Sequence, residues 1–220
     1  MSWILNIDTA LNTASVCLSE KGFPSLYTEN KIQKDHSSWL HISIKELIAE
    51  SGIDKKQLEA VCVNIGPGSY TGLRVGLSAG KGLCYALNIP LITVSSLELA
   101  AYAVKNEAYD LICPAIDARR MEIYSSLYDN KLHILQKPSA IVVTQETFTD
   151  MLNKHKILFC GDGSHKLKEV ISHANAMFSD NGGNAKQLAE ISYSLFRKNI
   201  FSHLATTQPL YLKDSYTAGN

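Results

Sequence analysis

Short apolar segments and longer amphipathic segments alternate along the first hundred residues. The short segments, rich in Val, Ile and Leu, predict β-strands, and the longer ones have the three- and four-residue spacing of helices. Strands are expected at residues 3–7, 14–18, 26–31, 61–65 and 91–94, and helices after Asp35, after Gly68 and after Ser95. This alternation predicts a sheet covered by helices.

The same alternation continues less regularly from about residue 106. Strands are expected at 111–116, 122–128, 139–143 and 157–160, and helices after Thr144, after Gly163 and over 184–199. The pattern predicts two α/β domains, 1–105 and 106–205, joined near 104–108. Residues 206–220 are expected to form a tail that is disordered beyond Asp214.

The helix expected after Gly68 has an unusual composition. Gly72, Gly76 and Gly80 recur every four residues and therefore share one face of the helix. Three glycines cost a helix about 3 kcal/mol relative to alanine unless something compensates. Close approach of another backbone is the expected compensation, because a glycine face holds no neighbour away. We therefore predict that this face receives a helix of a partner.

Charge and cysteine content narrow the function classes. The chain has 21 Lys and Arg against 21 Asp and Glu, a formal net charge of zero, which argues against a large electrostatic footprint for nucleic acid or membrane. The five cysteines are far apart and form no CxxC, as expected for buried thiols in a reducing compartment. With neither a signal-like start nor a segment of membrane-spanning length, the chain is predicted to be cytoplasmic.

Several residues are candidates for phosphate or metal chemistry. Asp8 and Thr9 end the first strand and resemble the DxGT-type turn with which actin-like and sugar-kinase-like ATPases meet phosphate and metal, although Ala10 and Leu11 replace its glycine-bearing part; alternatively, Asp8 simply caps its own turn. The turns Gly66-Pro67-Gly68 and Gly161-Asp162-Gly163 each join a strand to a helix, and their amides could cradle an anion or serve only as connections. His36 and His41 lie about 140° apart around a helix, so they cannot share a metal from one face.

A charged hairpin loop is expected at Asp117-Ala118-Arg119-Arg120. One interpretation is a solvated turn in which Asp117 pairs with Arg119 or Arg120. The alternative is that this loop faces an interdomain cleft or a partner.

Three stretches together resemble one family. NIGPGSYTGLRVGLSAGKGL, the opening ILNIDTALNTASVCL and the later IDARRMEIY strongly resemble the TsaB (YeaZ) family. The similarity covers most of residues 1–130 and resumes at 209–212. It implies a two-domain actin-like ATPase fold, of the sugar kinase, Hsp70 and actin type, with a reduced second domain and a tail over 206–220 that folds back toward the first domain.

The resemblance also implies a function. Members are non-catalytic partners of TsaD in the complex that transfers a threonylcarbamoyl group to N6 of the adenosine beside the anticodon, in tRNAs reading codons that begin with A. The chain would act there as a scaffold and activator, would help to form the site for the ATPase TsaE, and would reach tRNA only through the complex. No tightly bound cofactor is expected, although ATP or ADP could lie at the interface with the partner complex.

The helix starting with His36-Ser37 is similar to one that the family places beside the glycine helix. The resemblance therefore implies an interface with TsaD, or with a second copy of this chain, that involves both helices. Its predicted residues are His36, Leu40, Ile44, Gly72, Arg74, Gly76, Gly80 and Leu83.

TsaD itself carries a VNHxxGH-like segment whose two histidines hold the metal. Here the comparable run is VSSLELA, in which Ser96 and Ala100 replace the histidines, and neither side chain can act as an imidazole ligand.

Two enzyme alternatives remain: an actin-like ATP-dependent kinase or hydrolase using Asp8 and the glycine turns, and a peptidase. The first lacks a pair of metal-binding carboxylates, and the second lacks a zinc motif and a recognisable serine, histidine and acid set.

Overall fold

The computed structural model describes residues 2–32, 35–107 and 109–213. The chain divides into two compact units. The first consists of the described residues of Met1–Leu99 and Gly183–Pro209, and the second of those of Ala100–Gly182 and Leu210–Asn220.

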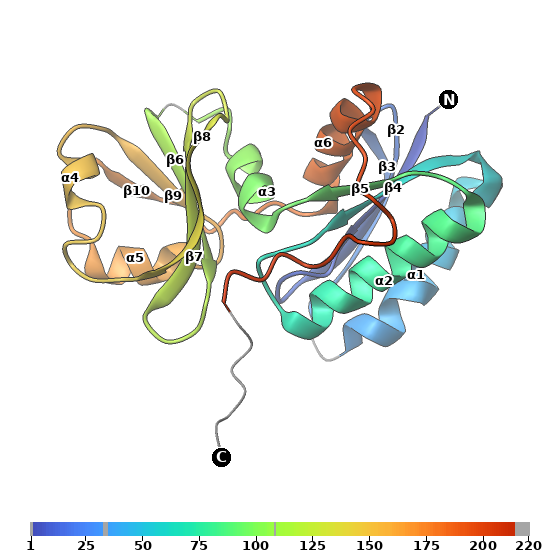
Figure 1. The fold of residues 1–220 in the computed structure, drawn as a ribbon, viewed down its shortest axis with the longest axis horizontal. Coiled ribbons are helices and arrows are strands. Elements are labelled where there is room, and N and C mark those ends of the chain that lie inside the picture. Colours follow the sequence, from blue (N-terminus) through green and yellow to red (C-terminus); the bar gives the residue numbers. More distant parts are fainter. Residues whose placement is uncertain (1, 33–34, 108, 214–220) are drawn as a thin grey trace, which may run out of the picture. The chain divides into compact units, whose positions relative to one another are not determined.

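The first unit is built on a mixed five-stranded sheet of order β3-β2-β1-β4-β5. Its strands are β1 (Trp3–Asp8), β2 (Ala14–Glu20), β3 (Phe23–Asn30), β4 (Leu58–Asn64) and β5 (Leu91–Val94). Helices α1 (His36–Ser51) and α2 (Tyr70–Leu87) cover one face, and α6 (Ala185–Arg197) covers the other (Figure 1). β1 is buried along its whole length because it lies in the middle of the sheet, with Leu5 between Leu18 and Val61.

The second unit contains a sheet of order β10-β9-β6-β7-β8. Its strands are β6 (Leu111–Asp117), β7 (Glu122–Asp129), β8 (Ile134–Val142), β9 (Ile157–Cys160) and β10 (Ala176–Phe178). The short helices α4 (Thr149–Leu152) and α5 (Ser164–Val170) belong to this unit, while α3 (Ser96–Ala103) runs into it from the first. A core around Phe159, Leu167 and Ile123 fills the space under α5.

The two sheets follow one plan. In each, an antiparallel three-stranded meander is extended by two strands that run parallel to its first strand. Asp8 and Asp117 end the corresponding strands β1 and β6, and the glycine turns follow the corresponding strands β4 and β9. The predicted α/β fold with two sheets covered by helices is confirmed.

Helix α6 corrects the predicted domain boundaries. It was assigned to a second domain of 106–205, but it packs on the first sheet, where Ser192 Oγ donates to Asn6 Oδ1 at 2.7 Å and the Ala185 amide donates to Ser15 Oγ at 3.0 Å. Because these contacts join α6 to the first sheet, α6 belongs to the first unit although it follows the second unit in the sequence. Only the start of the predicted 206–220 tail belongs to the first unit. Its end, predicted to be disordered, lies outside the described residues.

Four smaller differences concern single elements. β8 begins at Ile134 rather than at residue 139, and the helix expected after Thr144 is a single turn, α4. The short strand β10 and a 3-10 turn at Lys55–Gln57 were not predicted.

Candidate functional site

The three glycines that share one face of α2, Gly72, Gly76 and Gly80, are called the glycine stripe. They face the sheet of their own unit. A Cβ at Gly72 or Gly76 would lie less than 3.0 Å from the carbonyl oxygen or Oγ1 of Thr9, and one at Gly80 equally close to Val63. Thr9 Oγ1 also donates to the Gly72 carbonyl at 2.7 Å. The three glycines therefore meet Thr9, which directly follows β1, and Val63 of β4, and their predicted contact with a partner is wrong.

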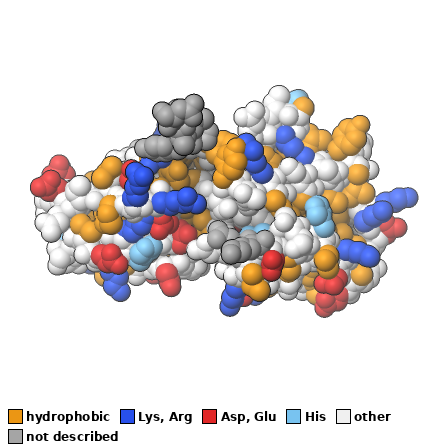
Figure 2. Space-filling model, turned by 90° about the horizontal axis from the view of Figure 1, so that it is seen from below, with side chains coloured by type: hydrophobic (Ala, Val, Ile, Leu, Met, Phe, Trp, Pro, Cys, Tyr) orange, Lys and Arg blue, Asp and Glu red, His pale blue; other side chains and the backbone are white. Residues whose placement is uncertain are grey.

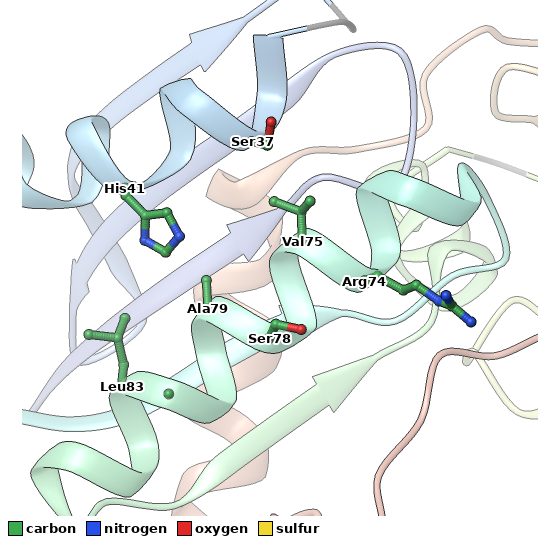
Figure 3. Close-up of a pocket in the computed structure, with 8 residues that line it drawn as sticks. Ser37, His41, Arg74, Val75, Ser78, Ala79 and Leu83 are labelled. Carbon is green, nitrogen blue, oxygen red and sulfur yellow. The ribbon is translucent and has the colours of Figure 1, made fainter.

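A groove lies on the other side of α2, where it runs beside α1. Its volume is about 550 Å³, and Figure 3 shows His41 on α1 facing Ala79 and Leu83 on α2. The groove is lined by Ser37, His41, Arg74, Val75, Ser78, Ala79, Gly82 and Leu83. No atom lies within 4 Å of a Cβ built on Gly82. The outward face of α2 is thus lined with small side chains and remains open.

Charge and apolar area border this groove. The Arg74 guanidinium lies 4.0 Å from the centroid of the Tyr70 ring, at the end of the groove and pointing away from α1 (Figure 3). A second hollow of about 290 Å³, lined by Ile44 and Leu83 among others, continues it. Hydrophobic side chains lie among histidine and charged ones on the face seen in Figure 2. Tyr85 on α2 is 83% exposed.

The remaining predicted interface residues lie at different depths. Arg74 and Leu83 line the two hollows, and so does Ile44, although it is only 5% exposed and belongs to the core of the first unit. His36 and Leu40 do not, because they lie on the inner side of α1 and are 4% and 0% exposed. Burial lowers the pKa of His36, and Leu40 belongs to the core of the first unit. Their assignment to a partner interface is therefore wrong.

Asp8 is tied into its own turn. Its Oδ1 accepts from the Ala10 amide at 3.1 Å and from Asn64 Nδ2 at 3.0 Å. Asn64 Oδ1 in turn accepts from Ser96 Oγ at 2.9 Å, so a buried polar chain links three elements. Burial raises the pKa of Asp8 to about 6. This geometry favours the interpretation of Asp8 as a turn cap.

Several backbone amides at the two glycine turns have partners within the protein: those of Gly66, Ser69, Gly161 and Gly163. The Ala10 carbonyl accepts from the Ser69 amide at 2.6 Å, so the loop after β1 covers the start of α2. The structure brings this loop against Gly68, where a Cβ would lie less than 3.0 Å from Ala10 O. In the second unit, the Gly161 and Gly163 amides donate to backbone carbonyls at 3.1 and 2.9 Å.

The part of the chain that the structure describes contains no group of three or more His, Cys, Asp or Glu side chains that could hold a metal ion. No helix within residues 2–32, 35–107 and 109–213 is both long and apolar enough to cross a bilayer.

The charged hairpin turn after β6 is held by a lysine that sequence reasoning missed. Lys166 Nζ donates to Asp117 Oδ1 at 2.7 Å and to the Glu122 carbonyl at 3.0 Å. Partial burial acts to raise the pKa of Asp117, but the hydrogen bonds from Lys166 and from the Arg119 amide hold it below its usual value. The proposed pairing of Asp117 with an arginine side chain is wrong, because Lys166 takes that place.

Comparison with known proteins identifies the family. A family model described as "TsaD: tRNA N6-adenosine threonylcarbamoyltransferase" matches residues 29–218. The tRNA threonylcarbamoyladenosine biosynthesis protein TsaB of Bacillus subtilis is 31% identical over 172 residues, which are 76% of this chain and 74% of that protein. The chain belongs to the TsaB (YeaZ) family.

Other TsaB relatives agree. TsaB of Escherichia coli is 32% identical over 126 residues, covering 57% of this chain and 54% of that protein. The solved structure of YeaZ from Pseudomonas aeruginosa superimposes with a TM-score of 0.83 at 23% identity, covering 96% of this chain and all of that one. The TsaB fold therefore extends over both units.

The two positions at which this TsaB-family chain departs from the TsaD histidine motif are enclosed. Ser96 is 1% exposed and donates to Asn64, and Ala100 is fully buried in an apolar cluster with Ile112 and Leu158. Neither side chain offers an imidazole nitrogen to a metal.

Proposed function

We propose that this chain is a non-catalytic partner of TsaD in the complex that transfers a threonylcarbamoyl group to N6 of the adenosine next to the anticodon, in tRNAs reading codons that begin with A. Its TsaB relatives carry the name of that pathway, and its matching family model is that of the transferase. The chain acts as a scaffold and activator of the transferase.

The observation that carries this proposal is the open face formed by α1 and α2. A helix pair of a partner can pack there, because Ser78 and Gly82 leave the α2 backbone accessible while Val75 and Leu83 offer apolar area. Small residues at a helix surface allow close interhelical approach, an argument taken by analogy from membrane helices. Two such pairs form a four-helix interface.

The proposal also covers the other components of the assembly. The same face serves a homodimer when TsaD is absent, so the two complexes exclude each other. TsaE joins the heterodimer as its ATPase, and any ATP or ADP is held at the interface between the subunits. The chain works in the cytoplasm and reaches tRNA through the complex.

Three features support a non-catalytic role. Asp8 is hydrogen-bonded inside its own turn, and the start of α2 is covered by the Ala10 carbonyl. Ser96 and Ala100 offer no ligand where TsaD has histidines. An ATP-dependent kinase or hydrolase needs an accessible carboxylate for its metal, and the burial of Asp8, which is 4% exposed, disfavours this alternative.

Size-exclusion chromatography with the TsaD-family protein of the same genome tests the proposal. Ser78→Arg places a long cation in the groove. Ser194→Arg is its matched control, because Ser194 is an exposed serine in the last turn of α6, in the same unit. Wild type and Ser194→Arg are expected to co-elute with the partner, and Ser78→Arg to elute alone while keeping its melting temperature. Co-elution of Ser78→Arg at wild-type affinity would overturn the interface.

A further inference from the structure

The turn between β6 and β7 presents two adjacent arginines in an unfavourable backbone conformation. Arg119 and Arg120 have φ angles of 64° and 50°, and both side chains are exposed. The left-handed region is uncommon for residues other than Gly, Asn and Asp, because Cβ approaches the following carbonyl. Two consecutive arginines there are more unusual than a single one.

The acidic groups at the base of this turn are already paired. Asp117 is bound by Lys166, with His165 Nε2 3.9 Å away, and Glu122 forms an ion pair with Lys213. The side chains of Arg119 and Arg120 form no ion pair or hydrogen bond with any described residue. The two guanidinium groups therefore carry positive charge that no carboxylate of the described residues neutralises.

The backbone of the turn favours a long anion over a small one. Its amides are used internally: the Arg119 amide donates to Asp117 Oδ1 at 2.5 Å, and the Ala118 and Glu122 amides donate to carbonyls. Exposed, adjacent guanidinium groups instead suit successive phosphates of a nucleic-acid backbone.

We propose that Arg119 and Arg120 contact the phosphodiester backbone of the tRNA when the chain is in its complex with TsaD. This inference rests on the proposed function, which brings an RNA to the assembly. Two phosphate contacts are too few to bind RNA on their own, so they act together with contacts made by the partner.

The test measures binding of an unmodified tRNA transcript to the reconstituted complex with the TsaD-family partner, by fluorescence anisotropy at several salt concentrations. Arg119→Gln/Arg120→Gln removes both charges. Arg119→Lys/Arg120→Lys keeps them. Lys154→Gln/Lys156→Gln is the matched control, because it removes two exposed cations just before β9, beside the start of β6 and therefore at the other end of that strand from Asp117.

The glutamine variant is expected to bind the transcript about tenfold more weakly near physiological salt and to lower the slope of log K against log salt by about 1.5. The lysine variant and the control should stay within about twofold of wild type. Co-elution with the partner and ADP binding are measured for each variant and should not change.

Equal tRNA affinity of the glutamine variant and the control, in an intact complex, would overturn this inference and leave the proposed function standing. So would a loss of ADP binding without a loss of tRNA binding, which would identify a nucleotide site. Failure of the wild-type chain to associate with the partner would overturn the proposed function and this inference with it.

Discussion

Replacing Gly76 with alanine adds one methyl group between α2 and the end of β1. The new Cβ would lie less than 3.0 Å from Thr9 Oγ1 and 3.6 Å from Ile7 Cγ2, so the Thr9 hydroxyl has to leave the Gly72 carbonyl. Overpacking costs about 1–3 kcal/mol and a buried, unpaired polar group about 1–3 kcal/mol, whereas alanine returns about 1 kcal/mol of helix propensity. The net loss is about 1–5 kcal/mol.

Gly82→Ala in the same helix is the matched control. No atom lies within 4 Å of its Cβ, so only the propensity gain of about 1 kcal/mol applies. Urea unfolding followed by circular dichroism should therefore rank Gly82→Ala above wild type and Gly76→Ala below it, with about 2–6 kcal/mol between the variants. A Gly76→Ala protein as stable as Gly82→Ala would refute the inward orientation of the stripe.

Three further predictions concern charge and ligands. Because the folded pKa of Asp8 is raised from 3.8 to about 6, its contribution to stability is complete below pH 3.8 and is lost as pH rises through about 6. Asp8→Asn should unfold like wild type at pH 4 and be more stable by about 3 kcal/mol at pH 8 in thermal melts, whereas equal stability at both pH values would contradict the buried charge. Elemental analysis of untagged protein should find no stoichiometric zinc or iron, and a coupled assay at most very slow ATP turnover; one tightly held metal per chain would contradict this. Filter binding should show no submicromolar tRNA affinity of the isolated chain at physiological salt, because its net charge is zero and Lys and Arg are interspersed with Asp and Glu (Figure 2).

The strands and helices of the first unit could be predicted because their buried positions are occupied by apolar residues at regular spacing along the sequence. β1 and β4 are enclosed by neighbouring strands and helices, so their sequences are nearly continuous apolar runs. β8 lies at an edge and is largely exposed, and Gln136, Lys137 and Pro138 interrupt its apolar pattern and hid its start. The place of α6 depends on contacts such as Ser192 with Asn6, which local patterns do not encode.

The site could be predicted only in part, for a geometric reason. Spacing of four residues shows that glycines share a helix face, but it does not show what that face meets. α2 carries two faces of small residues, one with Gly76 against the sheet and one with Ser78 and Gly82 in the groove, and the sequence pattern alone favoured the wrong one. Lys166 was missed because a helical lysine is usually exposed, whereas this one is 7% exposed beside Asp117.

The most direct test of the proposed function is the amount of threonylcarbamoyladenosine formed in tRNA, measured by nucleoside mass spectrometry after reconstitution with the TsaD-family protein and TsaE of the same genome. The account predicts no modified nucleoside with this chain alone, little with the partners alone, and efficient modification when wild type or Ser194→Arg is added. Ser78→Arg should fail to restore it. Modification by this chain without TsaD, or equal modification by the partners without this chain, would contradict the account.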